Sequence, residues 1–392
     1  MSLHTGFRRF AVALAVGALA ATAFPATAAA DPAADGAAGA AAWLAGRAAA
    51  DGGFGDPGTT ADAVFGLVAA DAGAGHTAAA LDFLSDPAVL APYIGTAETG
   101  YRAPQTAKIM LAVQAGGGDV NDFGGVDLEA ALRGLEGPDG RFPGVLAQQF
   151  AVLVLARDDQ GVSGAAVSAL VSMQCDDGGY NWSTTGGGCT GDVDFTAYAS
   201  AGLLAAGETT ASADALDWLE SVQGDTGGFS AGFPGAPENA NSTGLAAGVL
   251  ADGGRDDAAA KAVAFVLGLQ QGCDAPEADR GAINYDSGDF NPGPAVMATA
   301  QALTGITGEG LVGLDHSDDT DALPGLDCDG PSEPGESPAP EEPGTSPSAR
   351  PDESVLPVTG GSWGLPLMLG AALVVVGVVL AALTRRTGRG ER

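Results

Sequence analysis

The chain has 392 residues, 46% of them hydrophobic, and its 49 Asp and Glu residues outnumber 16 Lys and Arg to give a net charge of −33. Nucleic acid and anionic lipid surfaces would repel so acidic a protein, so no nucleic acid is expected among its partners. An acidic composition is also common among exported proteins, so the charge alone does not indicate a function.

The first thirty residues have the layout of a secretory signal peptide. Arg8 and Arg9 precede an apolar run from Phe10 to Phe24, and small residues ending at Ala30 come next. This order predicts cleavage after Ala30. We therefore assign 1–30 to a signal peptide and 31–328 to the folded domain.

The next part of the chain is repetitive. In four segments a Leu lies ten residues before the aromatic residue of a Gly-containing turn, at Leu44 and Phe54, Leu132 and Phe142, Leu170 and Tyr180, and Leu219 and Phe229. A second apolar run that opens with Thr and a small residue follows the turns, as at Thr196-Ala197. A repeat of roughly 40 to 45 residues with two helical runs is typical of stacked helical hairpins.

Six hairpins are predicted in chain order. The first helices fall near 37–50, 77–85, 127–136, 163–174, 212–223 and 257–271, and the second helices near 59–71, 103–114, 145–157, 193–206, 241–251 and 293–304. Ser163 and Ser212 occupy the expected N-cap positions. The first helices are amphipathic, which predicts an outer ring, whereas the second are small and apolar on all sides, which predicts an inner ring.

The Leu, Gln, Gly-Gly-aromatic and Thr-Ala pattern resembles the prenyltransferase and squalene-cyclase repeat. The resemblance covers roughly 37–304 and implies an all-α fold, an α/α toroid of about six hairpins. Toroids of this kind serve terpenoid cyclases, prenyltransferase subunits, vitamin-B12 carriers and complement-type thioester domains. The fold alone therefore does not determine the activity.

One segment resembles the D-x-D-D-T-A motif of protonating terpenoid cyclases. It reads Asp192, Val193, Asp194, Phe195, Thr196, Ala197. The resemblance implies that Asp194 is the acid, and Asp192 and Asp194 are the candidate catalytic residues. Phe195 departs from the motif, however, and Thr196-Ala197 is also the ordinary repeat position.

The sequence motifs of other toroid activities are absent or cannot be recognised. The zinc ligands of prenyltransferases and the Cys-Gly-Glu-Gln stretch of thioester domains are not found in the sequence. Paired carboxylates for polysaccharide chemistry stay open, because their spacing cannot be derived from the sequence.

A ligand site is predicted at the mouth where the N-termini of the inner helices gather. The candidate residues are Asp56, Tyr101, Arg102, Gln105, Gln148, Gln149, Asp192, Asp194, Tyr198, Asn239, Asn241 and Asn291. The alternative for each is a helix cap or a solvated loop residue. Trp182 is a further candidate contact, whereas Trp43, Trp218 and Phe265 are expected to pack between hairpins.

Four cysteines in an exported chain indicate two disulfides, which we predict as Cys175–Cys189 and Cys273–Cys328. No cofactor and no resident metal are expected. An acidic run after the last helix offers calcium candidates, although a solvated start to a linker explains it better. These candidates are Asp315, Asp318, Asp319 and Asp321.

The C-terminal part contains a spacer and an anchor. Residues 329–355 are rich in Pro, Glu and Ser and predict a disordered linker. The segment 356–392 contains Leu356, Pro357, Val358, Thr359 and Gly360, then an apolar run from Leu365 to Leu383 and a basic end. That run is long enough to span a bilayer.

This order resembles a sortase sorting signal. The resemblance implies that sortase cleaves after Thr359 and attaches the chain to peptidoglycan, on the outside of a Gram-positive cell. The membrane would be contacted only through the C-terminal helix before sorting.

Together these features predict a cell-wall-anchored surface protein whose toroid binds an extracellular small molecule, glycan or protein without catalysis, so that the chain is not an enzyme. One alternative is a terpenoid-cyclase-like or polysaccharide-active enzyme. The other is a structural or adhesive surface protein.

Overall fold

The computed structural model describes residues 31–182, 189–232 and 235–328. The predicted signal peptide, linker and sorting signal lie outside these ranges. Within them no helix is both long and apolar enough to cross a bilayer. The described part is predominantly helical and contains 13 α-helices.

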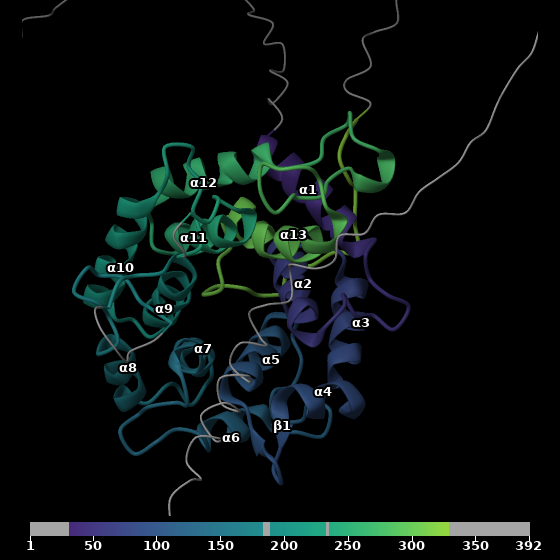
Figure 1. Cartoon of the computed structure of the whole chain (residues 1–392). Helices are drawn as coiled ribbons and strands as arrows, with labels where there is room; N and C mark the ends of the chain where they lie inside the picture. The colour runs from purple at the N-terminus through teal and green to yellow at the C-terminus, as the bar shows by residue number, and fades with distance from the viewer. Residues whose placement is uncertain (1–30, 183–188, 233–234, 329–392) are drawn as a thin grey trace, which may run out of the picture. The chain divides into compact units, whose positions relative to one another are not determined.

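Six of these helices form an inner ring (Figure 1). They are α2 (Pro57–Ala69), α5 (Ala103–Ala115), α7 (Val145–Ala156), α9 (Val193–Ala205), α11 (Ala240–Asp252) and α13 (Pro292–Ile306). Each packs against the next in chain order, and α13 packs against both α11 and α2, so the ring closes.

Six other helices lie outside this ring. They are α1 (Pro32–Ala45), α3 (Ala74–Ser85), α6 (Leu128–Arg133), α8 (Gly164–Val171), α10 (Thr209–Val222) and α12 (Asp256–Gly268). Each packs against at least one inner helix. The predicted toroid of outer and inner helices is therefore confirmed.

The structure corrects several details. The second hairpin contains an extra helix, α4 (Pro87–Ile94), which starts where the Asp86 side chain accepts from the Ala88 N–H. A short antiparallel pair follows, β1 (Gly95–Thr96) with β2 (Gly100–Tyr101), and the sixth hairpin holds a 3-10 turn, η1 (Glu277–Asp279).

One predicted N-cap is wrong. Helix α10 starts at Thr209 with Glu208 as its cap, and the Ser212 hydroxyl donates back to the Glu208 carbonyl at 2.6 Å. The other predicted cap, Ser163, is confirmed, because its hydroxyl oxygen accepts from the Ala166 N–H at 3.0 Å. A Ser one turn inside a helix can bond back to a carbonyl, which makes the two positions hard to separate in sequence.

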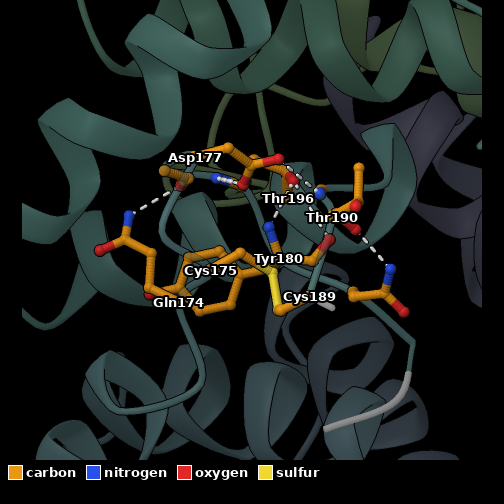
Figure 2. The surroundings of a disulfide bond; sticks show 11 residues. Gln174, Cys175, Asp177, Tyr180, Cys189, Thr190 and Thr196 are labelled. Carbon is orange, nitrogen blue, oxygen red and sulfur yellow. Dashed lines mark hydrogen bonds between the residues drawn. A yellow bond between two sulfur atoms is a disulfide. The ribbon is translucent and has the colours of Figure 1, made fainter. Parts of the chain in front are cut away.

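In four hairpins the Thr of the repeat binds the turn that precedes it. After the turn, a backbone N–H donates to the Thr hydroxyl oxygen at 2.9 Å in Phe54–Thr60, Tyr180–Thr196, Phe229–Thr243 and Ile283–Thr299. Figure 2 shows the pair Tyr180 and Thr196. In the third hairpin Gln148 replaces the Thr and accepts from the Phe142 N–H at 2.8 Å.

The Gln of the repeat joins neighbouring hairpins. The Gln223 amide donates to the carbonyls of Gly227 in its own turn and Ala258 in α12, both at 2.9 Å. Gln174 forms the equivalent pair (Figure 2). Gln270 donates to Gly281 at 3.1 Å and to Gly36 of α1 at 2.8 Å, and this bond joins the last hairpin to the first.

The paired glycines of the turn allow close packing of the next outer helix. Gly227 has a φ of +91°, and a Cβ added there would lie 2.3 Å from the Lys261 carbonyl oxygen. A Cβ added to Gly228 would lie 2.8 Å from the ring of Phe265. Phe265, like Trp218 against Gly179, therefore packs between hairpins as expected.

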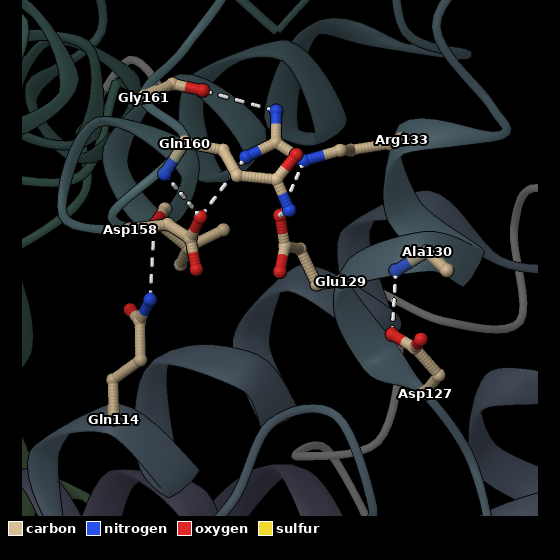
Figure 3. A network of polar contacts seen from close by, with 9 residues as sticks. Gln114, Asp127, Glu129, Ala130, Arg133, Asp158, Gln160 and Gly161 are labelled. Atoms are coloured by element: carbon tan, nitrogen blue, oxygen red, sulfur yellow. Dashed lines mark hydrogen bonds and ion pairs between the residues drawn. The ribbon is translucent and has the colours of Figure 1, made fainter.

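The third hairpin is held by an ionic network (Figure 3). The Arg133 guanidinium contacts Glu129 at 2.6 Å and Asp158 at 3.1 Å, and donates to the Gly161 carbonyl at 3.0 Å. The Gln160 amide donates to Glu129 at 2.7 Å. Since α6 is only 6 residues long, these bonds supply much of its attachment to the α7–α8 connection.

The structure contains both predicted disulfides. Cys175–Cys189 closes the Gly-rich excursion, with a Cα–Cα distance of 5.2 Å. Cys273–Cys328 ties the end of the described chain to the insertion after α12, with a Cα–Cα distance of 5.4 Å.

Replacing Thr243 by Val should lower the free energy of unfolding by about 1–3 kcal/mol, because the buried Phe229 N–H loses its acceptor. Urea unfolding followed by circular dichroism measures this change. Thr243→Ser keeps the hydroxyl and should recover most of the loss, while Thr210→Val, on the exposed side of α10, should change little. Equal stability of all three variants would contradict the role of the hydroxyl.

Gln270→Leu should destabilise the ring closure by about 1–3 kcal/mol, because the carbonyls of Gly36 and Gly281 lose a buried donor. Amide hydrogen exchange should then accelerate in α1 more than in α7, on the far side of the ring. Gln271→Leu is the same chemical change at the next position and serves as control. Uniform acceleration in both variants would refute a local closing bond.

Candidate functional site

The two ends of the inner ring differ, and the end at the helix C-termini is closed. A segment after α13 crosses it, held by the Arg157 guanidinium, which donates to the carbonyls of Leu311 at 3.0 Å and of Val312 and Leu314 at 2.5 Å. The Asp252 carboxylate accepts from the Val312 N–H at 3.4 Å. A ligand that approaches the ring interior must therefore use the end at the helix N-termini.

Several of the predicted ligand residues at that open end are helix caps. Asp56, Asp192, Asn239 and Asn291 accept backbone N–H bonds in the first turns of α2, α9, α11 and α13. Hydrogen bonds from the Thr59 hydroxyl and the Thr59 and Gly58 N–H groups outweigh burial and hold the pKa of Asp56 below its ordinary value. These four side chains therefore act as helix caps, which is the alternative given above for each candidate ligand residue.

Three further candidates have other partners. Gln148 is fully buried in the third turn, where its amide donates to the Gly140 and Ala166 carbonyls. Arg102 is exposed and donates to the carbonyls of Pro92 and Tyr93 at 2.7 Å. Tyr101 belongs to β2 and is half-buried.

The interior of the open end contains a chain of polar side chains from four inner helices. The Asn241 amide of α11 donates to the Gln301 oxygen of α13 at 2.8 Å, and the Gln301 amide donates to Asp62 of α2 at 3.3 Å. Lys108 of α5 completes the chain with an ion pair to Asp62 at 2.8 Å. Burial raises the pKa of Asp62 despite the opposing charge of Lys108.

Asp194 lies in the first turn of α9 beside this chain. Burial raises its pKa to about 6, against a lowering hydrogen bond from Ser242, and the charge of Asp192 raises it further. Its Oδ1 atom is buried and has no hydrogen-bond partner. The Asp194 carboxyl is therefore mostly protonated below about pH 6 and mostly ionised at pH 7.

Tyr198 lies one turn beyond Asp194 and reaches toward the middle of the ring. Its ring centroid lies 4.8 Å from that of Phe150. Burial, and then the charges of Asp62 and Asp194, raise its pKa well above the ordinary range. Tyr198 also borders two internal cavities of about 10 Å³ each, which are large enough for roughly one water molecule apiece.

From the predicted set, the structure thus brings Asp194, Tyr198 and Asn241 to this chain. The Gln149 amide of α7 donates to the Phe195 carbonyl of α9 at 3.0 Å. The sequence analysis missed Asp62, Lys108 and Gln301. A signal was available, because Asp62 stands inside the otherwise apolar second run of the first hairpin and Lys108 is one of only two lysines in the chain. An ionisable residue on a buried helix needs a partner.

Other candidates stand apart from this site. Trp182 is 66% exposed on the disulfide-closed excursion. No group of three or more His, Cys, Asp or Glu is arranged to hold a metal ion in the described residues. Of the four predicted calcium ligands, Asp321 accepts from the Gly75 N–H at 2.9 Å and Asp315 from the Ser317 N–H at 2.8 Å.

No protein-family model matches the sequence, and no curated protein matches it either. Solved structures do share the fold. The type II terpene cyclase MstE from Scytonema superposes with a TM-score of 0.53 at 16% identity, over 70% of this chain and 97% of that one. A variant of it in complex with geranylgeranyl dihydroxybenzoate gives 0.52 at 16%, over 70% and 96%.

A glycosidase has the same architecture. One of its variants, in complex with glucose, superposes with a TM-score of 0.50 at 12% identity, over 72% of this chain and 98% of the glycosidase. At these identities the likeness establishes the fold.

The expectation of a ring that binds its ligand without catalysis is wrong, and so is the expectation that the chain is not an enzyme. Two of the proteins that share the fold are enzymes, a terpene cyclase and a glycosidase. The alternative, an enzyme of terpenoid or polysaccharide chemistry, agrees better with these findings.

The raised carboxyl pKa values predict how stability depends on pH. Asp194, Asp252 and Asp319 each have a pKa of about 6, above the ordinary 3.8, mainly because of burial. Between these values the folded chain binds more protons than the unfolded chain, so stability should fall as pH rises from about 4 to about 6. Thermal unfolding of the full chain at pH 4.5 and pH 7 measures the difference.

Asp252→Asn provides the matched test, because it removes one of these groups while leaving an acceptor for Val312. It should raise the unfolding temperature at pH 7 by a few degrees and leave it nearly unchanged at pH 4.5. The exposed Asp289→Asn is the control. A fall in stability at pH 7 would contradict the raised pKa.

Proposed function

We propose that the chain is an enzyme that cleaves glycosidic bonds at the open end of the ring, with Asp194 as the general acid. The observation that carries this proposal is the carboxyl of Asp194, which has a pKa of about 6 and an unpartnered Oδ1. A general acid must be protonated at the working pH and must have an oxygen free to approach the substrate. Asp194 meets the first requirement at a working pH of about 6 or below, and its unpartnered Oδ1 meets the second.

The polarity of the surroundings favours a glycan over a hydrocarbon. Gln105, Gln149 and Asn241 each present a buried amide oxygen that has no partner. An apolar substrate would leave these oxygens unpaired, at a cost of about 1–3 kcal/mol each, whereas sugar hydroxyl groups can donate to them.

Glycosidic cleavage requires a second carboxylate, and Asp192 is the candidate. It accepts from the Phe195 N–H at 3.2 Å and the Gly232 N–H at 3.1 Å, and its charge acts on Asp194. In the proposed reaction Asp194 protonates the oxygen of the leaving sugar as the bond to the anomeric carbon breaks. Asp192 then assists attack at that carbon, as nucleophile or as base toward water.

A second candidate is an acid-initiated terpenoid cyclisation. It is favoured by the position of Asp194 in the Asp-Val-Asp-Phe-Thr-Ala stretch and by the TM-score of 0.53 to a terpene cyclase. The same carboxyl would protonate a carbon–carbon double bond instead of an oxygen. Incubation with geranylgeranyl dihydroxybenzoate, the compound bound in that neighbour, tests this candidate directly.

The two disulfides indicate an oxidising, extracellular environment. We further propose that the chain is exported through 1–30 and anchored to peptidoglycan at Thr359 by sortase, with 329–355 as a spacer. This placement supports a glycan substrate, since a wall-anchored enzyme meets extracellular polysaccharides. Release of the chain by a peptidoglycan hydrolase, but not by detergent, would agree with covalent anchoring.

The decisive test replaces Asp194 by Asn and compares two kinds of substrate. Hydrolysis of unactivated oligosaccharides should fall by about 10²–10⁴-fold, the range typical of a general acid. Hydrolysis of a dinitrophenyl glycoside should fall much less, because its leaving group departs without protonation. For the unmodified enzyme, kcat/KM should decline as pH rises above about 6, where Asp194 loses its proton.

The exposed Asp82→Asn removes the same charge from the outer helix α3 and should leave both rates unchanged. If Asp194→Asn lowers the hydrolysis rate equally for both kinds of substrate, Asp194 is not the general acid. Unchanged activity on both would reject the site altogether.

A further inference from the structure

The open end of the ring offers hydrogen-bond acceptors that lack donors. Three buried amide oxygens have no partner, namely Gln105 Oε1, Gln149 Oε1 and Asn241 Oδ1. They come from the inner helices α5, α7 and α11, and each lies in the first five residues of its helix. Buried polar atoms are nearly always satisfied, so such a group points to a missing donor.

The orientation of the Asn241 amide follows from its neighbours. The Asp62 carboxylate requires donors, so Gln301 must turn its NH₂ group toward Asp62, at 3.3 Å. The Gln301 oxygen then faces Asn241, which must donate through its own NH₂ group, at 2.8 Å. Asn241 Oδ1 is thereby left as the free atom, and exchanging the oxygen and nitrogen would break the chain.

Gln149 is oriented independently. Its NH₂ group donates to the Phe195 carbonyl at 3.0 Å, which fixes Oε1 as the unpaired atom. The residue is 0% exposed, so solvent does not replace the missing donor. Two amide oxygens from α7 and α11 are therefore held in place on either side of α9, which carries Asp194.

The ionised side chains at the open end are negative, as are the partial charges on the unpaired amide oxygens. Asp62 and Asp192 are carboxyl groups, and the Lys108 ammonium is already paired with Asp62 at 2.8 Å. Arg102 uses its guanidinium on the Pro92 and Tyr93 carbonyls. A cationic ligand with hydrogen-bond donors would donate to the unpaired oxygens and would also offset the negative charge of the carboxylates.

We propose that the substrate is a glycan that carries a free, protonated amino group, held by the amide oxygens of Gln149 and Asn241. This inference rests on the proposed glycan cleavage and adds the class of sugar. An ammonium group has three donors and no acceptor, which suits a site of acceptors. Acetylation of the nitrogen would remove the charge and leave one donor.

The test compares three β-1,4-linked tetrasaccharides that differ in one substituent, namely the oligomers of glucosamine, N-acetylglucosamine and glucose. Binding to the full chain is measured by isothermal titration calorimetry at pH 6, and cleavage by product analysis. The amino oligomer should bind at least about tenfold more tightly than the other two, because hydrogen bonds to charged groups are the stronger ones. Equal binding of all three would overturn the inference.

An acidic protein attracts any cation, so nonspecific attraction must be distinguished from binding at the site. Two variants that have the same net charge make this distinction. Gln149→Leu removes an unpaired oxygen at the open end. Gln114→Leu is its matched control. The Gln114 amide also donates to a carbonyl, that of Val154 at 3.0 Å (Figure 3), and its Oε1 is also unpaired. Gln114 lies in the last turn of α5, however, toward the closed end. Only Gln149→Leu should reduce amino-oligomer affinity, by about tenfold.

The outcomes separate this inference from the proposed reaction. Preferential cleavage of the acetylated or neutral oligomer would overturn the amino-sugar assignment and leave glycosidic cleavage standing. Selective binding of the amino oligomer with no cleavage of any glycan would reject the reaction while the binding chemistry holds. Equal effects of Gln149→Leu and Gln114→Leu would overturn the role given to the amide oxygen.

Discussion

The ring depends on one repeated hydrogen bond, from a backbone N–H just after each turn to a side-chain oxygen in the first turns of the following inner helix. The bond is buried in Phe229–Thr243 and recurs in four hairpins through Thr, and in the third through Gln148. Because an unpaired N–H would be costly there, the bond fixes each turn against the start of its inner helix. The bond consequently fixes where five of the six inner helices begin, and α5, whose Thr106 hydroxyl has no partner, is the exception.

Close packing of the inner helices then decides where chemistry can occur. A Cβ added at Gly244 would lie 2.5 Å from the Gln301 carbonyl oxygen, so α11 and α13 touch backbone to backbone. Such small residues leave internal cavities of only about 10 Å³. With the Arg157 segment across the closed end, a ligand can approach the ring interior only from the polar rim at the helix N-termini.

The helices were predictable because their residue periodicity is local, and the paired cysteines because the chain offers only four. The site was predictable only in part. Asp194 stood out within its motif, but its partners depend on contacts across the ring, since Lys108 and Asp62 are 46 residues apart and Gln301 and Asp62 are 239 apart. Sequence spacing carries no information about such pairs, and the caps at Asp192 and Asn239 look the same in sequence as ligand residues.

The position of Asp194 combines two opposing influences that suit an acid. Burial raises its pKa to about 6, so that below this pH Asp194 would carry the proton that the proposed reaction needs. The first turn of α9 presents the positive end of the helix dipole, which stabilises a nearby anion by about 0.3–1 kcal/mol. The carboxyl therefore holds its proton because it is desolvated, yet the anion that remains after proton transfer lies where the helix favours it. A carboxyl placed deeper in the ring would have the first property without the second.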